Sequence, residues 1–126
     1  MSRHDDARGP LLAWQWAHYP GGHADRTNLL VHAVTVPLFW SGLATLVLAP
    51  LSGAPLGALG GVAMMAIAVA AQGRTHKREE VAPQPFRGPL DVLARLFVEQ
   101  LVTFPRFVLS GGFARAWRAA GEPLGA

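Results

Sequence analysis

Apolar residues run almost without interruption along two stretches of the chain. Residues 29–48 contain no Asp, Glu, Lys or Arg, and His32 is their only strongly polar member. Residues 56–73 are also uncharged and are rich in Ala and Gly. A helix of about 20 residues is about 30 Å long, which matches a bilayer's hydrocarbon core. The pattern therefore predicts a transmembrane helical hairpin that turns at residues 49–55, with a buried hairpin in a soluble bundle as the alternative.

The residues after the second apolar run follow a different pattern. Between residues 90 and 109, Asp91, Arg95 and Glu99 recur every four positions, and apolar side chains lie on the other side of a helix. This periodicity predicts an amphipathic helix in the membrane interface, with the three charged residues on a solvated face. A second short helix is expected at residues 113–120, after a Ser-Gly-Gly sequence.

The chain begins with a polar segment, residues 1–13, which we expect to be flexible. A short tryptophan-rich helix is predicted at residues 11–19, where a Pro-Gly-Gly sequence ends it. The sequence contains neither an internal repeat nor the alternation typical of β-strands. We therefore expect one all-α domain, residues 1–126, in which amphipathic interfacial helices lie at the cytoplasmic side of the hairpin.

The composition fits a membrane protein better than a free soluble monomer. Of 126 residues, 51% are hydrophobic and 15% are charged, against about 25% charged in an average soluble domain. A small soluble domain has much surface to cover with charge, so this chain favours a bilayer or a homo-oligomer. The absence of cysteine excludes disulfides and thiolate metal sites. The net charge is +3, and the basic residues lie near the apolar runs. We therefore expect anionic lipid headgroups rather than nucleic acid as the partner.

Basic residues also predict a topology. Arg26 precedes the first apolar run, three basic residues follow the second, and the turn between the runs carries no charge. By the positive-inside rule, both termini are cytoplasmic. The three basic residues after the hairpin have a second interpretation, the capture of a fatty carboxylate; they are Arg74, Lys77 and Arg78.

Four of the five histidines lie near the end of the hairpin where its two helices begin and finish: His18, His23, His32 and His76. Asn28 is one helical turn from His32, and Gln72 and Glu80 lie one turn on either side of His76. Imidazole and carboxylate groups together suit iron, manganese or zinc, so the cluster predicts a metal site at the mouth of the hairpin. Glu79 remains an alternative to Glu80 as the carboxylate.

These residues form two motifs that resemble a known family. The first motif has Tyr, His, Asn and His before a Pro-containing apolar span, here Tyr19, His23, Asn28, His32 and Pro37. The second has Gln, His and Glu at four-residue spacing before a Pro, here Gln72, His76 and Glu80. Together they resemble the 2-hydroxy fatty acid dioxygenase family of small membrane proteins. Thr75 and Glu79 depart from the second motif, and the tail resembles a bacterial branch.

The resemblance implies an iron(II)- and O2-dependent α-oxidation that shortens a 2-hydroxy fatty acid by one carbon, in the bacterial inner membrane. It implies His23, His32 and His76 as Fe(2+) ligands, with His18 in reserve and Glu80 as a fourth ligand or an outer partner. Asn28 and Gln72 would hold ligands by hydrogen bonds, and Tyr19 would donate to substrate or oxygen. A non-enzymatic membrane scaffold and a different metal-dependent lipid enzyme stay open as alternatives.

Overall fold

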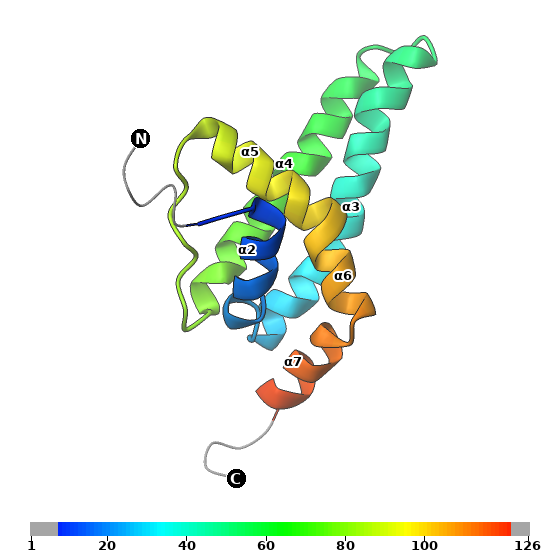
Figure 1. Cartoon of the computed structure of the whole chain (residues 1–126). Helices are drawn as coiled ribbons and strands as arrows, with labels where there is room; N and C mark the ends of the chain where they lie inside the picture. The colour runs from blue at the N-terminus through cyan, green and yellow to red at the C-terminus, as the bar shows by residue number, and fades with distance from the viewer. Residues whose placement is uncertain (1–7, 122–126) are drawn as a thin grey trace.

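The computed structural model describes residues 8–121, and the elements in that range are helical, with no strand among them. Residues 1–7 of the expected flexible start lie outside the described residues, and a helix already begins at Leu11. In chain order (Figure 1), the elements are α2 (Leu11–His18), a 3-10 turn (Pro20–Gly22), α3 (Arg26–Leu51), α4 (Gly57–Thr75), a 3-10 turn (His76–Arg78), α5 (Pro89–Val98), the π-helical turn η3 (Glu99–Thr103), α6 (Phe104–Leu109) and α7 (Gly112–Ala120).

Helices α3 and α4 form the predicted hairpin. The Asp25 carboxylate caps α3 by accepting a hydrogen bond from the backbone N–H of Asn28 at 2.9 Å. Gly42 and Gly61 let the two backbones approach closely, because a Cβ on Gly61 would lie 2.5 Å from the Gly42 carbonyl oxygen. The hairpin is thus held by a backbone contact that any larger residue would disrupt.

Both hairpin helices are long and apolar enough to cross a membrane. Helix α3 extends three residues beyond each end of its predicted span, and α4 begins one residue late and ends two residues late, so the turn is shorter than expected. In the most apolar 18-residue stretch of each helix, only 22% of the residues of the first and 17% of those of the second are buried within the chain. Large apolar side chains such as Leu48, Leu51 and Leu59 are exposed, so the hairpin is not an enclosed core of this chain.

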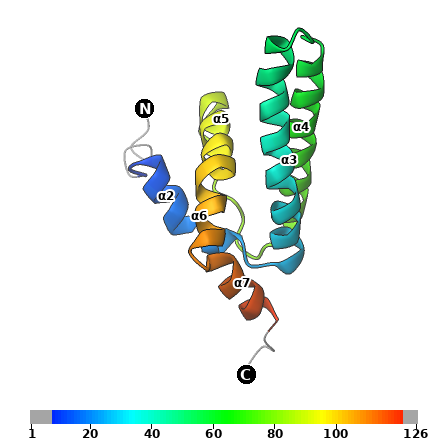
Figure 2. The ribbon, with the colours of Figure 1, turned by 90° about the vertical axis from the view of Figure 1, so that its right-hand side faces the viewer.

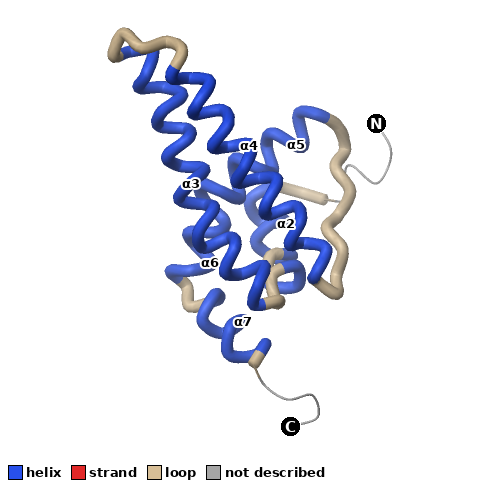
Figure 3. Tube along the Cα trace, turned by 180° about the vertical axis from the view of Figure 1, so that it is seen from behind, coloured by secondary structure: helices blue, strands red, loops and turns tan. Residues whose placement is uncertain are grey.

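The remaining helices pack beside one half of the hairpin (Figures 1 and 2). The main apolar core lies there and contains Tyr19, Leu29, Val36, Phe104 and Phe107. Seen from behind (Figure 3), the turn of the hairpin projects beyond the other helices. The fold therefore has one covered end and one bare end.

The segment predicted as a single amphipathic helix is divided by η3. The Phe104 N–H donates to the Glu99 carbonyl, five residues back, and Pro105 has no N–H to offer. The Gln100 carbonyl is therefore left to the Trp40 indole N–H, which donates to it at 2.7 Å. Such π-helical turns are frequent at functional sites.

The expected solvated face on this segment is wrong. The side chains of Asp91, Arg95 and Glu99 are only 8%, 11% and 13% exposed. They face the rest of the protein because α2 and the connector before α5 cover them, so their four-residue spacing marks an internal polar stripe.

Candidate metal centre

Three histidines and one glutamate converge at the covered end of the hairpin. Ligand atoms of His23, His32, His76 and Glu99 all lie within 4.8 Å of one another. The imidazole centroids are 4.7 to 5.1 Å apart, and each pair of rings is nearly perpendicular. Glu99 Oε2 lies 3.3 Å from His23 Nε2 and 3.6 Å from His32 Nε2.

Backbone carbonyls orient two of the imidazoles. His23 follows the Pro20–Gly22 turn, and its Nδ1 lies 2.8 Å from the Tyr19 carbonyl oxygen. His32 lies within α3, and its Nδ1 lies 2.9 Å from the Asn28 carbonyl oxygen. A carbonyl only accepts hydrogen bonds, so each Nδ1 carries the proton and each Nε2 faces the cluster as a potential metal donor.

The inward-facing nitrogens lack partners. Within the described residues, His23 Nε2, His32 Nε2 and His76 Nδ1 are buried and have no hydrogen-bond partner. Three lone pairs and a carboxylate directed at one point repel one another unless a cation lies between them. The donor set therefore fits a divalent metal ion.

Glu99 supplies the negative charge of the cluster. Burial alone would raise the pKa of this carboxyl, but the close approach of the His23 and His32 imidazoles outweighs burial and holds the pKa far below its usual range. Glu99 is thus an ionised ligand at neutral pH.

The cluster uses a different carboxylate from the one expected from the sequence. Glu80 is exposed and lies outside the four-residue group. Glu79 turns the other way: its carboxylate accepts the backbone N–H groups of Ala24 and Asp25, at 2.8 to 3.0 Å, and the Asn28 amide at 3.1 Å. Sequence reasoning assigned Glu99 to a solvated face and so missed it as a ligand. The one available signal was the polar pair Glu99–Gln100 within an otherwise apolar stretch.

Asn28 and Gln72 join helices rather than binding the histidine rings through their side chains. Asn28 Oδ1 accepts a hydrogen bond from the Thr75 hydroxyl at 2.7 Å. Gln72 and Gln100 form a reciprocal amide pair, at 2.7 and 3.1 Å, and Gln72 also donates to the Thr35 hydroxyl. These buried contacts fix α3, α4 and η3 around the cluster.

Tyr19 lies directly against the site, whereas His18 does not join it. The Tyr19 ring stacks on His23 with centroids 3.7 Å apart, and its buried hydroxyl has no partner among the described residues. Burial, together with the Glu99 charge, raises the pKa of this phenol well above its usual value, so it stays protonated. His18 is exposed, and its Nδ1 lies 2.8 Å from the Trp14 carbonyl oxygen.

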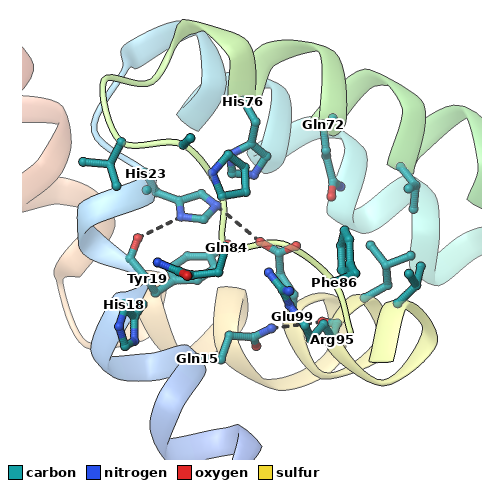
Figure 4. Close-up of a pocket in the computed structure, with 18 of the residues that line it drawn as sticks. Gln15, His18, Tyr19, His23, Gln72, His76, Gln84, Phe86, Arg95 and Glu99 are labelled. Atoms are coloured by element: carbon teal, nitrogen blue, oxygen red, sulfur yellow. Dashed lines mark hydrogen bonds and ion pairs between the residues drawn. The ribbon is translucent and has the colours of Figure 1, made fainter. Parts of the chain in front are cut away.

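A pocket of about 330 Å³ opens beside the cluster, between α2, α4, α5 and the connector before α5. Figure 4 shows His23, His76 and Glu99 on its wall. Much of the remaining lining is apolar: Val69, Val81, Ala82, Pro83, Phe86, Val92 and Leu96. Small-molecule sites in proteins are clefts of about 300–1,000 Å³ with mainly apolar linings, and this pocket lies at the lower end of that range.

The basic residues predicted to bind a carboxylate lie elsewhere. Arg74, Lys77 and Arg78 are exposed and are not among the pocket-lining residues of the described chain. Arg78 instead pairs with Asp25 at 3.1 Å.

Comparisons with known proteins do not assign the chain to a class. No protein-family model, curated protein sequence or solved structure matches the chain. Its geometry defines a buried three-histidine, one-glutamate cluster that could hold a metal ion.

Proposed function

We propose that this protein is a membrane-embedded iron(II)-dependent dioxygenase that shortens 2-hydroxy fatty acids by one carbon. The observation that carries the proposal is the juxtaposition of the His23/His32/His76/Glu99 cluster with an apolar pocket. The cluster offers three imidazole nitrogens and one carboxylate, a donor set that suits non-haem iron as well as zinc or manganese. The pocket offers an amphiphile an apolar place next to those donors.

The chain's own residues have distinct tasks in this proposal. The two carbonyl-bonded imidazoles, His23 and His32, are pre-oriented, so little order is lost when the ion binds. Glu99 lowers the net charge of the site, and Tyr19 holds a proton on a buried hydroxyl against His23. Iron bound here would supply the activation of O2.

The location of the site suits a lipid substrate. In the proposed topology the hairpin spans the bacterial inner membrane, and both termini lie in the cytoplasm. An acyl chain would reach the pocket beside α4 while its polar head lies at the histidines. One O2 per 2-hydroxy acid balances to the acid one carbon shorter, CO2 and water.

The test is metal content combined with turnover. We expect protein purified in mild detergent to bind iron and to convert 2-hydroxypalmitate to a product one carbon shorter, only when O2 is present. Glu99→Gln should lose most of the iron, and Glu80→Gln, on the exposed side of the same region, is the matched control. Turnover without O2 would replace oxidation with metal-dependent hydrolysis. Folded protein without metal or product would reject the proposal.

A further inference from the structure

One charged side chain in the pocket wall has no role in the proposed metal site. Arg95 lies on α5, one turn before Glu99, and lines the pocket. Its guanidinium is packed between aromatic rings, 4.1 Å from the Phe86 centroid and 5.0 Å from that of Trp14. The side chain is only 11% exposed. A cation is thus held at the edge of an apolar cavity.

The polar partners of Arg95 are few. Among residues 8–121, its guanidinium makes one hydrogen bond, to the Pro85 carbonyl at 3.2 Å, and one ion pair, with Asp91 at 3.7 Å. A guanidinium has five N–H donors, and a buried charge is costly unless it is paired. Burial accordingly lowers the pKa of Arg95 despite the Asp91 carboxylate.

The Asp91 carboxylate is already engaged. Its Oδ1 accepts a hydrogen bond from Arg8 at 2.8 Å, and its Oδ2 accepts one from the Arg87 backbone N–H at 3.0 Å. Arg8, Arg95 and Asp91 together carry a net charge of +1. Asp91 therefore neutralises only one of the two guanidinium groups beside it.

We propose that Arg95 is the receptor for the carboxylate of a single-chain anionic amphiphile in this pocket. The guanidinium fork matches a carboxylate, and the chain of the ligand would contact Val69, Val92 and Leu96. The identity of the substrate rests on the proposed function. The assignment of a carboxylate site to Arg95 rests only on the pocket and on the buried guanidinium. It assigns head-group recognition to Arg95 instead of the exposed Arg74, Lys77 and Arg78.

The experiment compares two ligands with one chain length. Palmitate and 1-hexadecanol compete with a fluorescent fatty acid for full-length, metal-free protein in detergent at pH 8, so that no metal can bind the carboxylate. We expect palmitate to bind wild-type protein about tenfold or more tightly than the alcohol, as for a hydrogen-bonded ion pair. Arg95→Met should abolish that preference, and Arg95→Lys should keep part of it.

Arg106→Met is the matched control. Arg106 also packs over a tryptophan, with its guanidinium carbon 4.0 Å from the Trp16 centroid, but it does not line the pocket. This variant should keep the preference for palmitate. Thermal melting shows which variants fold, and if Arg95→Met does not, wild type and Arg95→Lys still decide.

Equal binding of palmitate and the alcohol to wild type would overturn the role of Arg95, as would a preference that survives Arg95→Met. The failure of the proposed function is separable. A carboxylate preference that depends on Arg95, in protein without O2-dependent turnover, supports Arg95 and rejects the oxidation. O2-dependent turnover by wild-type protein that binds palmitate and the alcohol equally supports the oxidation and rejects the role of Arg95.

Discussion

The two ends of the hairpin differ in what they bury. At the covered end, polar groups lie inside: Asn28, His32, Thr35 and Gln72 are all buried. At the bare end, the helices touch through Gly42 and Gly61, and leucines near the turn are exposed. Polar side chains inside a low-dielectric region need partners. Thr75 and Glu79 are the partners of Asn28, Gln72 pairs with Thr35 and Gln100, and Glu99 lies beside His32. The buried polar groups of the covered end therefore find their partners within the described chain, whereas the exposed leucines of the bare end face its surroundings.

The largest expected effect follows from breaking the covered end at a ligand. His32→Ala removes a buried donor from the centre of the cluster. We expect metal affinity to fall by more than about 100-fold, beyond the loss typical of an outer partner. Metal content by mass spectrometry measures it. His18→Ala is the control, and an equal loss there would contradict the assignment.

Breaking the bare end should cost stability but leave the metal site intact. A Cβ on Gly61 meets the Gly42 carbonyl and the Leu46 backbone, whereas a Cβ on Gly60 meets nothing within 4 Å. We expect Gly61→Ala to destabilise the hairpin by about 1–3 kcal/mol, as overpacking does. Thermal melting in detergent should separate Gly61→Ala from the control Gly60→Ala. Equal melting of the two variants would refute the close contact.

Glu79 joins the segment before α3 to the end of α4 without touching the metal donors. Its carboxylate holds the Ala24 and Asp25 N–H groups and the Asn28 amide. Glu79→Ala should let His23 move away from His76, and we expect about a tenfold loss of metal affinity. Titration with Co(II), followed by its absorption spectrum, measures both affinity and geometry. Glu80→Ala should leave both unchanged, and a spectrum unaltered by Glu79→Ala would exclude the positioning role.

The bare end of the hairpin was easier to predict from the sequence than the covered end. Hydropathy placed both helices to within a few residues, because apolar length is a local property. The histidines could be grouped because a hairpin brings its two ends together. Glu99 could not be grouped with them, because its place depends on a π-helical turn and on packing against segments far away in the sequence. Four-residue spacing alone cannot distinguish a solvated stripe from one that faces a pocket.

The smallest expected effect concerns the turn that carries Glu99. Trp40→Phe deprives the Gln100 carbonyl of its indole donor, which should cost about 1 kcal/mol. The missing N–H of Pro105 created that free carbonyl, so Pro105→Ala restores a donor at the i→i+5 position. We expect the cost of Trp40→Phe, measured by thermal melting, to shrink in the Pro105→Ala background. Equal costs in both backgrounds would show that the indole packs at this site without serving the carbonyl.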